Sequence, residues 1–243
     1  MSRYSSAVEL ATGHGTAQLL RRITMRNSPT LVGAGAAARP TPPDLLFDDS
    51  NWIRNIVPAD GVSEWVAETF LRAGAPLHNA DHEHLIDADV AYLWAAVENV
   101  RQMRRVVGQC EEVMIRAGGW QRARQEQQLC EWFGRVPAFL ITLDAHYARE
   151  CTDLQWCALV EHELYHIGQR LDDFGAPAFT KGGMPKLGIR GHDVEEFVGI
   201  VRRYGTGGGA GDTAKLVDAA RRAPEVGHAD IARACGTCIL RAA

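Results

Sequence analysis

The sequence has little of what marks membrane, secreted or repeat proteins. No apolar run approaches the ~20 residues of a membrane span, and the N-terminus has no apolar stretch typical of a secretory signal. Six cysteines in 243 residues are too few for a disulfide scaffold. No internal repeat is visible. We therefore expect a globular cytoplasmic protein that does not associate with membranes.

The sequence also lacks a large excess of either positive or negative charge. The chain has 26 basic and 30 acidic residues, a formal net charge of −4, which argues against a general nucleic-acid coat. Apolar residues make up 46% and charged residues 23%, which excludes a chain that is disordered throughout. One region is locally basic through Arg101, Arg104, Arg105, Arg116, Arg122 and Arg124. We interpret these arginines as a solvated face, with contact to nucleic acid or an acidic partner as the alternative.

Glycine and proline divide the chain into three parts. Residues 1–44 contain a low-complexity Gly/Ala run and Pro40, Pro42 and Pro43, so we expect a poorly ordered extension. Residues 45–205 are predicted to form the folded domain. Residues 206–243 open with a Gly-rich linker and continue as a short helical tail that carries a C-x-x-C pair.

The folded part is predicted to mix strands and helices. Apolar and β-branched runs indicate strands, and apolar periodicity with polar N-caps indicates helices. Strands are expected at 90–94, within the stretch 88–97, and at 106–108 and 139–144. Helices are expected at 64–71 after Ser63, at 120–133, at 153–170 capped by Thr152 or Asp153, and at 193–204. A Gly- and Pro-rich loop, 174–190, separates the last two helices.

The strongest chemical signal is His162-Glu163-Leu164-Tyr165-His166, an H-E-x-x-H pattern. In a chain of this composition the pattern is expected by chance only about 0.02 times. On a helix, residues four apart share a face, so His162 and His166 can bind one Zn²⁺. Glu163 is then placed to act as general base. We expect Tyr165, between the two histidines, to point away and pack in the core.

Catalytic zinc needs a third protein ligand. We favour His192, which follows His166 after the Gly-rich loop, with Glu195 and Glu196 as alternatives. Asp193 is a candidate N-cap, or a partner that orients a ligand imidazole.

Three segments together resemble the phage metallopeptidase family: Phe139–Ala145, Cys157–His166 and Gly191–Phe197. Residues 101–108 and the terminal Cys235-Gly236-Thr237-Cys238 are also similar to it, so the resemblance spans roughly 65–238. It implies an α+β, zincin-like peptidase of the SprT/Spartan kind, with a small mixed sheet packed on the H-E-x-x-H helix. In such enzymes a Gly-His segment before a Phe-bearing helix supplies the third ligand. Here Phe197 lies one place later, which keeps Glu195 and Glu196 open.

The predicted function is zinc-dependent hydrolysis of peptide bonds in a protein or peptide substrate. Tyr147 or Tyr204 is a candidate donor to the oxyanion, and strand 139–144 is expected to pair with an extended substrate. The alternative is a non-proteolytic zinc-binding adaptor or nucleic-acid-associated module on the same fold. An intact Glu163 favours the enzyme.

Two further clusters have weaker interpretations. His78, His82 and His84 are interpreted as a polar loop, with a second metal site or substrate contacts as alternatives. Cys235 and Cys238 have zinc-ribbon spacing without a second pair. We favour two small apolar residues on a terminal helix, with a structural-zinc or redox role as the alternative.

Overall fold

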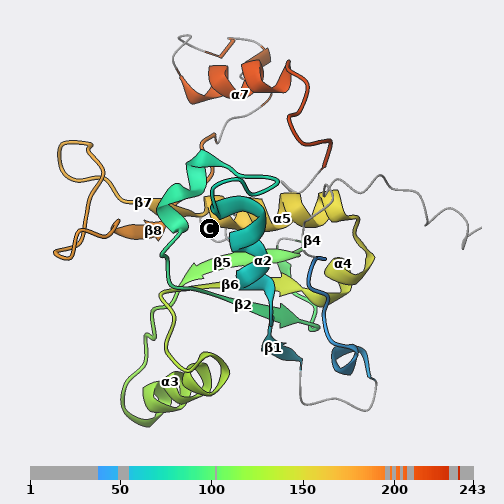
Figure 1. The fold of residues 1–243 in the computed structure, drawn as a ribbon, viewed down its shortest axis with the longest axis vertical. Helices are drawn as coiled ribbons and strands as arrows, with labels where there is room; N and C mark the ends of the chain where they lie inside the picture. Colours follow the sequence, from blue (N-terminus) through green and yellow to red (C-terminus); the bar gives the residue numbers. More distant parts are fainter. Residues whose placement is uncertain are drawn as a thin grey trace, which may run out of the picture. The chain divides into compact units, whose positions relative to one another are not determined.

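A computed structural model describes residues 38–48, 55–101, 103–194, 198, 201–202, 205–206, 211–229 and 235. All of them belong to one compact unit, Val32–Ala243. The fold is mixed α+β with small sheets (Figure 1). Its strands are β1 (Ile56–Pro58), β2 (Val90–Ala95), β3 (Val100–Arg101), β4 (Arg104–Arg105), β5 (Gly108–Glu112), β6 (Phe139–Asp144), β7 (Ile167–Gln169) and β8 (Leu187–Ile189). Its α-helices are α2 (Val62–Val66), α3 (Gly119–Phe133), α4 (Ala145–Glu150), α5 (Asp153–Tyr165) and α7 (Asp212–Ala220).

The central sheet has the strand order β1-β2-β6-β5. β6 pairs in parallel with β2 and antiparallel with β5, so it lies inside the sheet. The prediction that strand 139–144 pairs with substrate is therefore wrong, because both of its edges are already paired. The strand at that end of the sheet is β5, whose two glutamates, Gln and Gly give only a weak strand signal.

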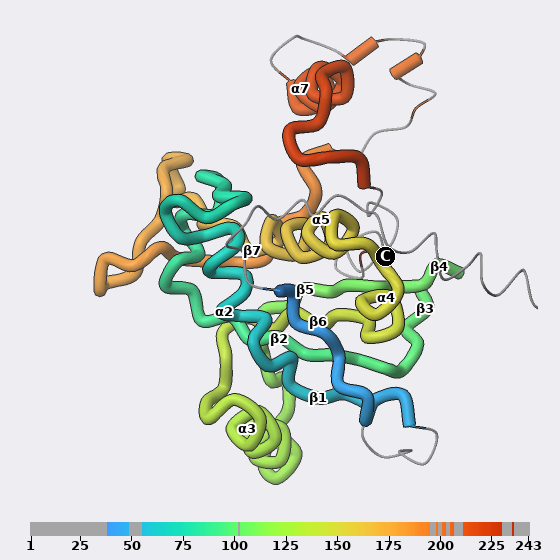
Figure 2. The backbone as a smooth tube through the Cα atoms, turned by 45° about the vertical axis from the view of Figure 1, so that its right-hand side comes forward, coloured from blue at the N-terminus to red at the C-terminus, as the bar shows by residue number. Residues whose placement is uncertain are grey.

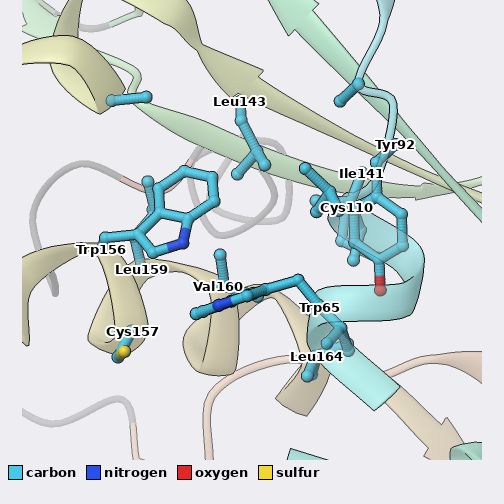
Figure 3. Close-up of a cluster of buried hydrophobic side chains, with 14 of the residues drawn as sticks. Trp65, Tyr92, Cys110, Ile141, Leu143, Trp156, Cys157, Leu159, Val160 and Leu164 are labelled. Atoms are coloured by element: carbon cyan, nitrogen blue, oxygen red, sulfur yellow. The ribbon is translucent and has the colours of Figure 1, made fainter. Parts of the chain in front are cut away.

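Helix α5 covers one face of this sheet, and α3 lies on the other side (Figure 2). Trp156, Leu159, Val160 and Leu164 of α5 are buried against the sheet side chains (Figure 3). This apolar face fixes the helix on the sheet and leaves its remaining side chains for other contacts. On the opposite face, Trp132 and Phe133 of α3 pack against a smaller group of buried residues, namely Ala91, Leu93 and Leu140.

Helix α5 begins where the sequence predicted. The Thr152 side chain accepts from the Gln155 backbone N–H, and the Gln155 side chain accepts from the Thr152 backbone N–H, which forms a capping box. The helix ends at Tyr165, five residues earlier than expected. The residues that follow leave the helix to form β7, which pairs antiparallel with β8.

Other expected elements differ in detail or lie outside the described residues. The strand expected at 106–108 is observed as β5, which starts at Gly108 and runs on to Glu112. The helix expected after Ser63 starts at Val62 with Gly61 as its N-cap, and continues as a π-helix, Ala67–Leu71. Most of residues 1–44 and most of the helix expected at 193–204 lie outside the described part of the chain. No helix among the described residues is long and apolar enough to cross a membrane.

Candidate metal centre

The H-E-x-x-H residues lie at the C-terminal end of α5. His162 is in the last turn of the helix, and His166 is its C-cap with helical backbone angles, φ −71° and ψ −14°. Because the helical geometry continues through His166, the two imidazoles stay on one side, with ring centroids 5.1 Å apart. The two predicted ligands therefore face the same space.

The structure brings His192 to this pair from the segment after β8. Its Nε2 lies 3.4 Å from His162 Nε2. Tetrahedral zinc with Zn–N bonds of about 2.0–2.1 Å holds two nitrogens about 3.3–3.4 Å apart, so this spacing fits two ligands of one ion. The His192 ring is also stacked on His166, with centroids 5.4 Å apart.

His166 is oriented by a backbone contact. Its Nδ1 lies 2.9 Å from the Arg190 carbonyl oxygen, and in the neutral ring this nitrogen donates to that oxygen. The other nitrogen, Nε2, is then left as the acceptor that can bind a metal. Such outer contacts set the tautomer and orientation of metal-binding histidines.

A cysteine that the sequence analysis did not place here joins the histidines. Cys235 Sγ lies 3.2 Å from His166 Nε2, and Cys235 is 1% exposed. Ligand atoms of His162, His166 and Cys235 all lie within 4.8 Å of one another. Cys235 forms an isolated parallel bridge with Gly108 of β5, so the favoured interpretation, a small residue on a terminal helix, is wrong for it. Cys238 lies outside the described residues.

Glu163 is fully buried between α5 and β5. A Cβ placed on Gly108 would lie 2.7 Å from Glu163 Oε1, so only glycine lets β5 approach the carboxyl group this closely. Neither carboxyl oxygen has a hydrogen-bond partner of normal geometry among the described residues. Burial raises the pKa of Glu163 well above its usual value, and the nearby Cys235 thiol raises it further.

The histidines have shifted pKa values of opposite sign. Burial, with the imidazoles of His166 and His192, lowers the pKa of His162 to about 4. Burial also lowers the pKa of His166, but the contacts with Cys235 and with the Arg190 carbonyl outweigh it and raise the value. At neutral pH the His162 ring is therefore uncharged, which is the form that binds a metal.

A cavity of about 640 Å³ opens beside these imidazoles. His162, His166 and His192 line it, together with Asp81, Tyr165, Arg190, Gly191, Asp193, Val194 and Leu216. Tyr165 therefore lies at the site, contrary to the expectation that it points into the core. Its hydroxyl donates to Asp81 Oδ2 at 3.0 Å and accepts from Asn79 Nδ2 at 2.8 Å.

The cluster of His78, His82 and His84 does not converge. His82 is fully buried with its ring 4.4 Å from the Tyr165 ring, and the His84 ring nitrogen lies 2.7 Å from the Ile167 carbonyl oxygen. His78 is exposed. Among the described residues these three form no metal-binding group. His82 and His84 instead pack against Tyr165 and Ile167 at the end of α5, close to the candidate metal centre.

Other predicted site residues fall elsewhere or are not described. Asp193 pairs with Arg190 rather than with a ligand imidazole. Tyr147 is in α4 and packs against the core. Glu195, Glu196 and Tyr204 lie outside the described residues. Of the six arginines in the basic region, Arg105 forms two hydrogen bonds to Asp144 and Arg122 pairs with Glu126.

The comparisons with known proteins give one match. A family model described as "putative phage metallopeptidase" matches residues 63–221, which include α5 and all three histidines. No curated protein and no solved structure matches the chain significantly. A metallopeptidase family implies a bound metal ion, and the donor set at the end of α5 fits one. The chain belongs to the putative phage metallopeptidase family.

Proposed function

We propose that the protein is a zinc-dependent peptidase with a zincin-like active site. The observation that carries this proposal is the convergence of three imidazoles beside a buried Glu163 at the end of α5. Zinc accepts such nitrogen ligands in tetrahedral geometry, and catalytic zinc sites commonly have three protein ligands. We assign His162, His166 and His192 as these ligands.

When bound, zinc supplies Lewis acidity, which activates water and polarises the peptide carbonyl. The chain's own residues do the rest. Glu163, adjacent to the first ligand, takes the proton from the attacking water and passes it to the leaving amine. Burial raises the pKa of its carboxyl group in the metal-free site, and a bound cation beside it would favour the ionised form that accepts a proton. Arg190 holds the His166 ring in place through its carbonyl oxygen.

The substrate is proposed to be a protein or peptide that pairs with β5. This strand lies at the end of the sheet and packs directly against α5 at Gly108 and Glu163. An extended peptide added to such a strand gains backbone hydrogen bonds, and its scissile bond lies beside the helix that carries the ligands. β5 therefore takes the role that the sequence had assigned to strand 139–144.

The test is the Glu163→Gln variant, assayed for zinc content and for cleavage of casein and unstructured peptides. Glutamine keeps the shape of the side chain but cannot accept the proton, so we expect zinc to remain stoichiometric while cleavage falls by about 10² or more. Unchanged cleavage in Glu163→Gln contradicts the assigned role.

The burial of Cys235 at the same centre favours a second candidate function. Structural zinc sites have four protein ligands and no open position. The protein is then a zinc-binding adaptor without peptidase activity, and its partner is a protein or a nucleic acid. Bound zinc without cleavage by the wild type, in the presence or absence of DNA, would support this candidate.

A further inference from the structure

The thiol of Cys235 lies at the metal-facing nitrogen of His166. The 3.2 Å between Sγ and Nε2 is a few tenths of an ångström shorter than the about 3.6 Å expected for Zn–S and Zn–N bonds of about 2.3 and 2.05 Å in a tetrahedral site. Cys235 and His166 are both almost completely buried. Ligand atoms of His162, His166 and Cys235 lie within 4.8 Å of one another, so this thiol can bind the same ion as these two histidines.

The same thiol lies on the side of the centre where the general base is. Cys235 bridges Gly108, and the Glu163 carboxyl group lies against the Cα of that glycine. Glu163 is buried, and its oxygens have no partner of normal hydrogen-bond geometry among the described residues. A water that serves Glu163 as a nucleophile must contact both this carboxyl group and the metal. The Cys235 sulfur lies at the metal-facing nitrogen of His166, and its residue bridges the glycine that lies against Glu163, so the thiol would compete with such a water.

We propose that the Cys235 thiolate is a fourth, displaceable zinc ligand that closes the active site. When the S–Zn bond forms, the thiol would lose its proton to solvent and the metal-bound water would leave, so that the sulfur takes the coordination position that catalysis requires to be open. This inference rests on the proposed function, since it assumes zinc held by His162, His166 and His192.

The bridge to Gly108 gives the closure a second effect. Gly108 is the first residue of β5, the strand proposed to pair with substrate. With Cys235 bridged to it, this end of the strand is already occupied. Withdrawal of Cys235 would therefore open the metal and the substrate-pairing edge together, so this single residue lowers the activity of the resting enzyme.

The test compares the wild type with Cys235→Ala after loading each with cobalt and with zinc. Cobalt bound to a thiolate shows an intense charge-transfer absorption in the near ultraviolet. We expect this band in the wild type, and its loss in Cys235→Ala with one equivalent of metal still bound. A thiolate tethered beside the metal acts at an effective concentration of mM or more, so it competes strongly with water for the fourth position. Removing it should therefore raise cleavage by about tenfold or more in Cys235→Ala.

Cys130→Ala is the matched control, because Cys130 is an exposed thiol on α3. It should keep both the absorption band and the wild-type activity. Absence of the band in the wild type would overturn the inference, as would loss of stoichiometric metal from Cys235→Ala, since Cys235 would then be one of the essential ligands. A Cys235-dependent band in the wild type, with no cleavage by either protein, would support the ligand assignment and refute the peptidase.

Discussion

At the scale of single residues, the centre depends on the protonation of closely packed imidazoles. His162 has its pKa lowered to about 4, first by burial and then by the two neighbouring rings. When the pKa of a histidine is lower in the folded state than in the unfolded state, protonation favours unfolding. The stability that the neutral ring contributes is therefore fully present above the unfolded pKa of about 6.5. That contribution is lost as the pH falls from about 6.5 through 4.

This shift predicts the titration of the metal-free protein. We expect the His162 imidazole to stay neutral down to about pH 4, as measured by NMR of the ring nuclei, with its signals identified from the His162→Gln variant. Between about pH 6.5 and pH 4, protonation of His162 should lower the free energy of unfolding by at most about 3 kcal/mol. The His162→Gln variant should lack this contribution. A His162 titration midpoint near 6.5 would show that the three rings are not packed together in the absence of metal.

Residue-level prediction from sequence succeeded where spacing alone determines geometry. Four positions on a helix bring His162 and His166 to one face without knowledge of the fold. The approach of His192 was also predicted, from a Gly-rich loop that lets the chain return. Cys235 could not be placed, because it is 69 positions from His166 and its approach to the site involves a pairing with Gly108 that no local pattern predicts. The C-x-x-C spacing was the one signal available.

At the scale of elements, the contact between β5 and α5 determines where the general base lies. Gly108 allows the strand to approach until its Cα lies against Glu163 and Leu159. Sequence patterns can identify strands and helices, but they do not show which strand lies at the edge of the sheet. For this reason strand 139–144 was assigned the substrate edge, although it lies between β2 and β5.

The close approach predicts the effect of Gly108→Ala. The added Cβ would lie 2.7 Å from both Glu163 Oε1 and Leu159 Cδ1, so β5 and α5 must separate. We expect the free energy of unfolding to fall by about 1–3 kcal/mol in urea denaturation, and cleavage to fall as Glu163 is displaced. Gly182→Ala is the control, because its Cβ would meet only Thr180 Oγ1 at 3.9 Å, and its effect should stay within about 0.5 kcal/mol. Equal stability of the two variants would mean that β5 does not press against α5.

At the scale of the whole molecule, the centre joins segments that are far apart in the chain. His162 and His166 belong to the end of α5, His192 follows β8, and Cys235 lies near the C-terminus. The sequence could predict the separate segments, but their meeting depends on the sheet that carries β5 and on the β7–β8 pair that turns the chain back. A metal bound to all of them therefore links distant parts of the fold.

This linkage predicts that metal removal destabilises the protein as a whole. A ligand that binds the folded state and not the unfolded state adds about 2.7 kcal/mol of stability at 100 times its Kd. For a chain of this length we expect a chelator to lower Tm by roughly 5–10 °C relative to zinc-loaded protein, and added zinc to restore it. His162→Ala should respond to neither addition, whereas His78→Gln, which removes an exposed histidine outside the centre, should respond like the wild type. A wild-type Tm that is the same with chelator and with zinc would mean that these imidazoles do not hold a metal that ties α5 to the segment after β8.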